Sequence, residues 1–241
     1  MAYGRLARRL RALNLASFAD YRARLKSDPA EIGRCINALT TNLTRFFREA
    51  HHFDHLRDSL AAPRRASGET GRFRVWSAGC SSGEEPYSIA MSLREAFGAA
   101  PHWDVKVLAT DLDTDMVARA ARGVYPAEAL GSIPHRAHST LRRRGDEIEI
   151  VEGVKGLITF KQLNLMHQWP MRGPFDAIFC RNVMIYFDRQ TQRELVTRFY
   201  DLLSPRGFLY LGHSENLHRV SEDFQLIGRT IYQPLARGAA A

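Results

Sequence analysis

The sequence predicts an α/β protein preceded by an all-helical N-terminal domain. Residues 1–61 carry helical patterns, whereas the rest of the chain alternates short apolar runs with helical stretches. Such alternation is typical of a mostly parallel sheet with helices on both faces. With 241 residues, 45% of them hydrophobic, the chain can bury a main core and a smaller one. No apolar run approaches the roughly 20 residues of a membrane span, so we expect a cytoplasmic protein without membrane insertion.

The helical domain, expected at residues 1–61, contains two recognisable helix starts. Ser17 and Asp28 are predicted N-caps, because each precedes a helical pattern and has a side-chain oxygen that can accept a backbone N–H. Pro29 and Glu31 stand at the first and third helical positions after Asp28, as in a capping box.

Positive charge is concentrated near the N-terminus. The net charge is +8, and residues 1–26 contain seven basic residues and one acidic residue. On a helix, the leucines of this segment share one face, and its arginines point to solvent on the other. This basic face either keeps the protein soluble or docks an acidic partner, a nucleic acid or an acidic protein. The leucines are Leu6, Leu10 and Leu13, and the arginines are Arg5, Arg8, Arg9 and Arg11.

The α/β domain is predicted at residues 72–241, after a linker at residues 62–71 that reads APRRASGETG and has the composition of a connector. Residues 146–165 interrupt its alternation with two β-like runs, which predict a hairpin or a small antiparallel insertion. The expected strands lie at residues 73–78, 105–110, 175–180 and 207–212, and the expected helices at about 85–97, 113–121 and 189–203.

The cysteines are expected to be reduced thiols. Cys35, Cys80 and Cys180 are odd in number and widely spaced, which suits neither a disulfide framework nor a zinc site. The sequence therefore predicts no metal site.

The loop after the first expected strand has the character of a ligand-binding loop. Gly79 and Gly83 allow the backbone to turn tightly, and Glu84 and Glu85 follow at the start of a helix. The spacing of four residues between the glycines excludes the dinucleotide pattern G-x-G-x-x-G, and the absence of Gly-Lys-Ser/Thr excludes a P-loop. The two acids repel phosphate and favour a positively charged ligand, such as an ammonium or a sulfonium.

Asp111 follows the second strand, at the position of the acid that binds ribose hydroxyls in related folds. A ribose without a pyrophosphate indicates S-adenosylmethionine. Each residue also has a structural alternative: the glycines as turn residues, Asp111 or Asp113 as a helix N-cap, and the glutamates as partners of the helix dipole. Their joint placement at strand ends favours the ligand.

Five blocks of the chain resemble the CheR family of chemotaxis receptor methyltransferases, in order and spacing. The resemblance covers nearly the whole chain and implies an S-adenosylmethionine-dependent protein-glutamate O-methyltransferase that esterifies the cytoplasmic helices of chemoreceptors. It also implies a Rossmann-like class I methyltransferase domain with a small β subdomain at about residues 127–163. The blocks are TTNLTRFFREAHHF (40–53), VWSAGCSSGEEPYSIAM (75–91), ATDLDTDMVARAARGVYP (109–126), FDAIFCRNVMIYFD (175–188) and GHSENL (212–217).

The resemblance also implies the site residues, where the blocks match. Arg48 is expected to position the reactants as well as the cofactor, and Tyr186 is either an active-site wall or a packing residue. His213 either borders the substrate entrance or caps its loop. The residues expected to bind S-adenosylmethionine, and its product S-adenosylhomocysteine, are Asn42, Thr44, Arg48, Gly79, one of Glu84 and Glu85, Asp111, Asn164, Leu165, Arg181 and Asn182.

The main requirement of this methyl transfer is that the protein positions the reacting groups. A glutamate carboxylate is ionised at neutral pH and a sulfonium is a good leaving group, so methyl transfer needs no strong general base. Holding the reacting atoms in line, in a site that excludes water, lowers the activation barrier by several kcal/mol. The sequence accordingly contains no recognisable Ser/His/Asp set and no H-E-x-x-H motif.

The resemblance sharpens the expected partners. Receptor methylation regions are rich in glutamate, so the basic face of the first helix becomes a candidate docking surface for them, and nucleic acid is not expected. Family members usually have another helix before the segment that YGRLARRL resembles, so we expect either that the helical domain is truncated at its start or that Met1 is not the true start. The insertion is short, so binding of a receptor C-terminal peptide is not expected. We expect a monomer. The alternatives are a non-catalytic S-adenosylmethionine-binding regulator and a nucleic-acid or small-molecule methyltransferase.

Overall fold

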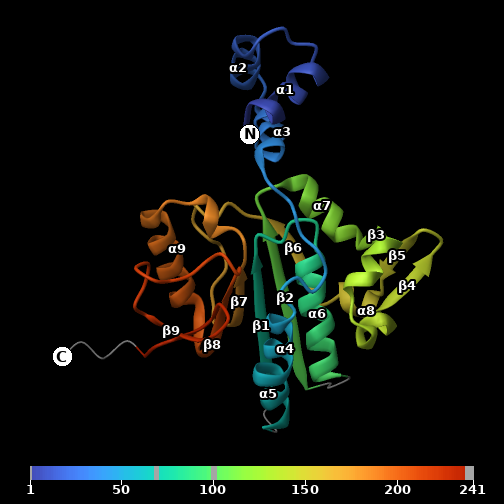
Figure 1. Ribbon diagram of the computed structural model, residues 1–241, viewed down its shortest axis with the longest axis vertical. Coiled ribbons are helices and arrows are strands. Elements are labelled where there is room, and N and C mark those ends of the chain that lie inside the picture. The colour runs from blue at the N-terminus through green and yellow to red at the C-terminus, as the bar shows by residue number, and fades with distance from the viewer. Residues whose placement is uncertain (1, 68–70, 99–101, 237–241) are drawn as a thin grey trace.

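The computed structural model describes residues 2–67, 71–98 and 102–236. A small helical domain stands above the edge of a twisted seven-stranded sheet, and a three-stranded subdomain lies to one side (Figure 1). The N-terminal elements are α1 (Ala2–Ala12), α2 (Phe18–Ser27), α3 (Pro29–Leu39), α4 (His51–His55), the π-helix η1 (Leu56–Ala61) and α5 (Ala62–Ala66).

From β1 onward the chain follows the predicted alternation of strands and helices, with short 3₁₀ segments in between. The strands of the main sheet are β1 (Gly71–Ala78), β2 (Trp103–Asp111), β6 (Ile158–Gln162), β7 (Phe175–Cys180), β8 (Leu203–Leu211), β9 (Phe224–Gly228) and β10 (Ile231–Pro234). The helices are α6 (Glu84–Phe97), α7 (Thr114–Arg122), α8 (Glu152–Lys155) and α9 (Arg189–Leu202), and the 3₁₀ segments are η2 (Ala127–Ser132), η3 (His135–Thr140) and η4 (Met184–Tyr186).

The main sheet has the order β6-β2-β1-β7-β8-β10-β9. The first five strands in this order are parallel to their neighbours, and β10 and β9 add an antiparallel hairpin at one edge. Val75 of β1 pairs with Val107 on one side and Ala177 on the other, so the carboxyl ends of β1, β2 and β7 meet at one edge. The predicted α/β class and its four strands are confirmed, with shifts of a few residues at their ends.

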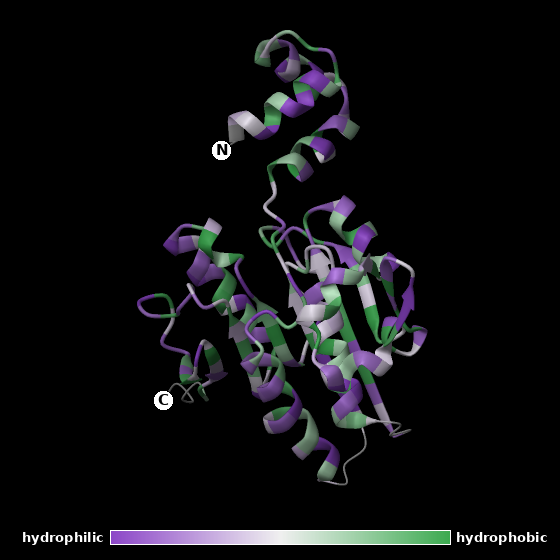
Figure 2. Cartoon of the chain, turned by 45° about the vertical axis from the view of Figure 1, so that its right-hand side comes forward, coloured by the Kyte–Doolittle hydropathy of each residue, from purple (hydrophilic) through white to green (hydrophobic). Residues whose placement is uncertain are grey.

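Two hydrophobic cores cover the two faces of this sheet, because side chains alternate along each strand. Phe73 and Val75 face the core formed with α6, whereas Trp76 and Ile178 face the core formed with α9. β7 is buried along its whole length, as expected for a central parallel strand. The apolar colouring of the strands in Figure 2 follows this burial. The two cores fix the sheet and hence the strand ends that carry the site.

The predicted N-caps are confirmed, but the capping box does not form. The Ser17 side chain accepts the backbone N–H of Asp20, and the Asp28 side chain accepts that of Ala30. The Asp28 backbone N–H, which a capping box gives to Glu31, instead donates to a carbonyl of α2.

Glu31 is instead fully buried and holds the helical domain together. It accepts two hydrogen bonds from Arg9, at 2.9 and 2.7 Å, one from Arg34 at 2.9 Å, and one from the Tyr21 hydroxyl at 3.0 Å. Burial acts to raise the pKa of Glu31, but these arginines outweigh it and lower the pKa below its usual range. The prediction that Arg9 faces solvent is therefore wrong, because a buried carboxylate lies opposite it.

Arg5 also turns inward. Its guanidinium donates to the backbone carbonyls of Leu39 and Thr40, both at 2.5 Å, and to the Thr41 hydroxyl at 2.9 Å. It therefore ties α1 to the chain that leaves α3. Of the predicted basic face, Arg8 and Arg11 remain exposed.

The predicted linker at 62–71 is not a connector between domains. Its first residues form α5, its last residue begins β1, and its residues 68–70 lie outside the described residues. Helices α4 and α5, with η1 between them, pack against α6, so they belong to the α/β body (Figure 1). The helical domain ends with α3, and residues 40–50 connect the two parts.

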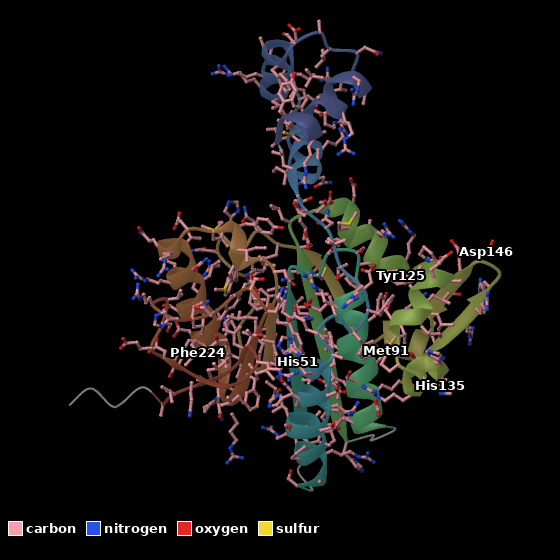
Figure 3. The ribbon with its side chains drawn as sticks, viewed as in Figure 1. His51, Met91, Tyr125, His135, Asp146 and Phe224 are labelled. Atoms are coloured by element: carbon pink, nitrogen blue, oxygen red, sulfur yellow. The ribbon has the colours of Figure 1, made fainter. Side chains whose placement is uncertain are left out.

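The predicted insertion is confirmed in kind and corrected in extent. β3 (Val124–Pro126), β4 (Leu141–Arg144) and β5 (Glu147–Ile150) form an antiparallel sheet in the order β3-β5-β4. Its β4–β5 turn, with Asp146, projects away from the main sheet (Figure 3). The second β-like run is not part of it: after α8 it forms β6, which pairs in parallel with β2. The insertion therefore ends before residue 158.

Candidate active site

A cavity of about 600 Å³ lies at the carboxyl ends of β1, β2, β6 and β7, below the helical domain. Its volume falls within the roughly 300–1,000 Å³ typical of small-molecule sites. It is also where ligands bind in open parallel sheets. Every residue predicted to bind the cofactor except Glu84 lines it, and so do Tyr186, the last residue of α3 and residues 40–45 of the connection that follows.

The glycine loop after β1 is held tightly and needs its glycines. Gly79 has a φ of 104°, and a Cβ there would lie 2.4 Å from a methyl of Val183. Gly83 has a φ of 100°, and a Cβ there would lie 2.6 Å from the Tyr125 hydroxyl. The backbone N–H groups of Gly79 and Cys80 both donate to the Thr110 carbonyl, at 2.8 and 2.9 Å. The loop therefore closes over the end of β2, and a side chain at Gly79 would displace the cavity wall.

The structure distinguishes the two adjacent glutamates. Glu85 lines the cavity, accepts the Ser77 hydroxyl at 2.8 Å and pairs with Arg181 at 3.1 Å. Glu84 is buried outside the cavity lining, where it accepts the Ser82 hydroxyl at 2.6 Å. The acid that faces the cavity is therefore Glu85. Burial raises its pKa, and Arg181 and Ser77 counteract that shift.

Asp111 lies at the end of β2 with its carboxylate fixed by the backbone. One oxygen accepts the Ser81 N–H at 2.7 Å, and the other accepts the Asp113 N–H at 2.9 Å. Burial raises the pKa of Asp111, while these backbone donors counteract it. The N-cap of α7 is Asp113, not Asp111. Asp111 is therefore free of a capping role and still has lone pairs for ligand hydroxyls.

Asp113 also joins the connecting segment to the sheet. Its second oxygen accepts hydrogen bonds from the Thr40 hydroxyl at 2.6 Å and the Asn42 amide at 2.9 Å. Asn42 thus lines the cavity while its amide group holds the connection in place. Thr44 and Arg48 continue the same wall, and Arg48 donates to the Leu43 carbonyl at 3.2 Å.

Arg181 is a buried guanidinium between two carboxylates. It lies 3.1 Å from Glu85 and 3.3 Å from Glu49, and over the ring of Phe53 at 5.4 Å. Burial acts to raise the pKa of Glu49, but Arg181 and His213 outweigh it and lower the pKa. The Nε of Arg181, which lines the cavity, is buried without a hydrogen-bond partner among the described residues. Such an unsatisfied donor beside a cavity indicates a polar ligand.

The loop after β7 is organised by Glu215. Its buried carboxylate accepts four backbone N–H groups, those of Asn182 at 2.8 Å, Val183 at 2.9 Å, Ile185 at 3.2 Å and Gly212 at 2.6 Å. Asn182 has a φ of 58°, so this bonding network holds a residue in the left-handed region. These hydrogen bonds hold Asn182 in the cavity wall.

The remaining predicted residues lie at different depths of the site. Leu165 is buried in the cavity wall, and Asn164 caps its own loop by accepting the Met166 N–H at 2.9 Å. Tyr186 lines the cavity mouth with 60% of its surface exposed, which excludes a core-packing role. His213 lies outside the cavity lining, 3.1 Å from Glu49.

Three residues of this region, Arg5, Glu49 and Glu215, were not predicted from the sequence as part of the site. Arg5 lines the cavity from α1, and no pattern around it signals this. The available signals were positional: Glu49 directly follows the predicted site residue Arg48, and Glu215 lies just after the last expected strand.

These residues fit S-adenosylmethionine. A ligand that combines hydroxyls, positive charge and a carboxylate matches the close approach at Gly79, the carboxylates of Glu85 and Asp111, and the unsatisfied Arg181 Nε.

Within the part of the chain that the structure describes, none of the helices has the length and apolar character of a membrane span.

Comparisons with known proteins agree with this geometry. Residues 42–233 match the family model of the CheR methyltransferase SAM binding domain, and residues 1–40 match the CheR methyltransferase all-alpha domain. Their junction coincides with the end of α3. A chemotaxis protein methyltransferase 2 of Pseudomonas aeruginosa is 46% identical over 240 residues, covering 97% of this chain and 84% of that protein.

Two further relatives also match over nearly the whole chain. The chemotaxis protein methyltransferase of Escherichia coli is 46% identical over 241 residues, which cover 96% of this chain and 82% of that protein. A probable chemotaxis protein methyltransferase of Rhizobium etli is 41% identical over 249 residues, which cover 99% of this chain and 92% of that protein. The similarity therefore extends over both the helical domain and the α/β domain.

Proposed function

The chain belongs to the CheR methyltransferase family, and from this premise we propose that it methylates glutamate side chains on the cytoplasmic helices of a chemoreceptor. Membership makes it an S-adenosylmethionine-dependent methyltransferase of chemotaxis. The acceptor group, the receptor and a location in the cytoplasm are the proposal.

The observation that carries the proposal is the chemistry of the cavity lining. Among the described residues, no histidine, lysine or cysteine lines the cavity. Its two carboxylates are already engaged, Glu85 by Arg181 and Ser77, and Asp111 by two backbone N–H groups. An amine or hydroxyl acceptor needs a group that removes its proton, whereas a carboxylate is ionised at neutral pH. The lining therefore favours a carboxylate acceptor.

We assign the parts of the cofactor to residues of the cavity lining. We place its ribose hydroxyls at Asp111, its adenine near Asn164 and Leu165, and its amino-acid end near Glu85 and Arg181. When bound, S-adenosylmethionine supplies an electrophilic methyl group on a sulfonium. The chain contributes fixed charges and walls: the buried ion pairs around Arg181 hold these groups before any ligand arrives, which reduces the reorganisation needed for reaction.

The mouth of the cavity is where the acceptor enters. Tyr186 and Leu43 are exposed there, and Arg48 lies inside it, held by the Leu43 carbonyl. We assign Tyr186 to the wall that excludes water and Arg48 to positioning, because a tight ion pair with the reacting carboxylate would weaken it as a nucleophile.

The helical domain supplies a candidate docking surface that is narrower than the sequence suggests. Arg5 and Arg9 are committed to internal contacts, so Arg8 and Arg11 carry the exposed charge of α1. The double variant Arg8→Glu and Arg11→Glu should slow receptor methylation and weaken its salt dependence, with S-adenosylhomocysteine affinity unchanged. An equal loss of S-adenosylhomocysteine binding would sink this assignment. We further propose a monomer that does not bind a receptor C-terminal peptide.

The proposal is tested by transfer of labelled methyl from S-adenosylmethionine to a purified receptor cytoplasmic fragment. We expect label on the receptor that alkali releases as methanol, because carboxyl esters are hydrolysed by base. Label that resists alkali would indicate methylation of nitrogen. Transfer to nucleic acid, or cofactor binding without any transfer, would favour the alternative functions.

A further inference from the structure

The cavity is lined by arginines that differ in how they are held. Arg5 donates to two carbonyls and a hydroxyl, and Arg181 is paired with two carboxylates. Arg48 donates to the Leu43 carbonyl. All of these guanidinium groups are therefore engaged within the chain.

Arg45 is different. It lines the same cavity and is exposed, yet it makes no hydrogen bond or ion pair with any residue that the structure describes. Its neighbours Phe46 and Phe47 are buried in the core, so the backbone at Arg45 is firmly anchored while its side chain faces the mouth. A charged side chain without a partner, on an anchored backbone beside an active site, is available for a ligand.

The exposed lining residues around Arg45 carry no charge. The other exposed residues of the lining are apolar, aromatic or a neutral hydroxyl: Leu39, Thr41, Leu43, Met166 and Tyr186. Leu43 is 83% exposed and Met166 47% exposed. Among the described residues, Arg45 is thus the charged member of a mostly apolar rim, which fits a substrate that presents both apolar and acidic side chains.

We propose that Arg45 is a specificity-determining residue that binds a second acidic side chain of the substrate helix, one turn away from the glutamate that is methylated. This inference rests on the proposed function and goes beyond it by naming a sequence requirement of the substrate. Residues three or four positions apart on a helix have Cβ atoms about 5–6 Å apart. A long arginine at the rim can therefore reach one acid while its neighbour enters the cavity.

The reacting carboxylate itself is a poorer partner for Arg45. A guanidinium bound to the nucleophile lowers its reactivity, and the exposed position of Arg45 lies at the rim rather than in the buried interior around Arg181. At the rim the ion pair acts on substrate binding and not on the methyl-transfer step. Its effect belongs in KM for the substrate, with kcat and cofactor affinity preserved.

The test compares Arg45→Ala, Arg45→Lys and Arg45→Glu with the wild-type protein in labelled methyl transfer to a receptor fragment. Arg206→Ala is the matched control, because Arg206 is also exposed and lies at the opposite end of β8 from the cavity edge. We expect Arg45→Ala to raise KM about 5- to 10-fold at low salt. Arg45→Lys should recover most of the loss, and Arg45→Glu should exceed it.

A second arm changes the substrate. Replacing the acids that lie three and four positions from the methylated glutamate with glutamine should raise KM for the wild-type protein and leave Arg45→Ala almost unaffected, because the pair is then already absent. Calorimetric titration with S-adenosylhomocysteine should give equal affinities for all variants.

The outcomes separate this inference from the proposed function. No transfer by the wild-type protein would overturn both. Normal transfer with equal KM for wild type and Arg45→Ala would overturn the role of Arg45 alone. Loss of S-adenosylhomocysteine binding in Arg45→Ala, or additive effects of the protein and substrate changes, would also overturn it.

Discussion

The substitution Glu215→Gln removes the charge that organises the loop after β7. Each oxygen of this carboxylate accepts two backbone N–H groups, and 5% of the residue is exposed. In glutamine one oxygen becomes an NH₂ group, so two of these backbone donors lose their acceptor and face another donor. A hydrogen bond to a charged group contributes about 1.5–3 kcal/mol. Two such bonds are lost, and the loop can relax partly to find other partners, so we expect a total loss of stability of about 3 kcal/mol.

The consequence should reach the cofactor, because the same bonds hold Asn182 against the cavity. We expect Glu215→Gln to lower the free energy of unfolding by about 3 kcal/mol in urea. We expect the affinity for S-adenosylhomocysteine, measured by calorimetry well below the unfolding transition, to fall by about tenfold or more. Glu222→Gln is the matched control, since Glu222 is exposed. Wild-type affinity in folded Glu215→Gln would refute the role of this carboxylate.

Three further outcomes are expected. Asn182→Gly, which keeps the positive φ without strain, should weaken S-adenosylhomocysteine binding severalfold by calorimetry at an unchanged Tm; unchanged affinity would make Asn182 a turn residue. Gly79→Ala should reduce cofactor affinity at least tenfold, because its Cβ would meet Val183 at 2.4 Å, and wild-type binding would contradict that clash. Burial lowers the pKa of His52 to about 3 from 6.5, so between these values the unfolded chain binds a proton that the folded chain does not. Stability should therefore fall as pH drops below 6.5, by up to about 1.4 kcal/mol per unit. His52→Gln should flatten that slope in urea titrations, and an unchanged slope would rule out this cause.

The sheet and the edge that carries the site could be predicted from the sequence. Parallel strands bring their carboxyl ends together, so the polar residues after β1, β2 and β7 had to meet wherever the alternation was correct. That rule placed Gly79, Asp111 and Asn182 at one cavity. It could not choose between Glu84 and Glu85, because adjacent residues at a helix start point about 100° apart and the loop geometry decides which one faces the cavity.

Other features depend on partners that a local pattern does not show. Amphipathicity assigns charged residues to solvent, yet Arg9 meets a buried carboxylate from α3, and Arg5 meets backbone carbonyls. The sequence around Glu215 is typical of a surface loop. Its partners are backbone N–H groups, which are present at almost every position, so no residue type in the sequence marks them as partners of a buried carboxylate. The run that became β6 has the length of a hairpin strand, and only its pairing with β2 shows its place.

The proposed function requires that glutamate carboxylates of a chemoreceptor accept the methyl group. Peptide mapping by mass spectrometry, after incubation of the receptor's cytoplasmic fragment with the protein and S-adenosylmethionine, tests it most directly. We expect a single added methyl on glutamate side chains of the helical region, removed by mild alkali and absent when those glutamates are replaced by alanine. Methylation at lysine, arginine or cysteine, or an unmodified receptor beside a protein that binds S-adenosylhomocysteine, would contradict it.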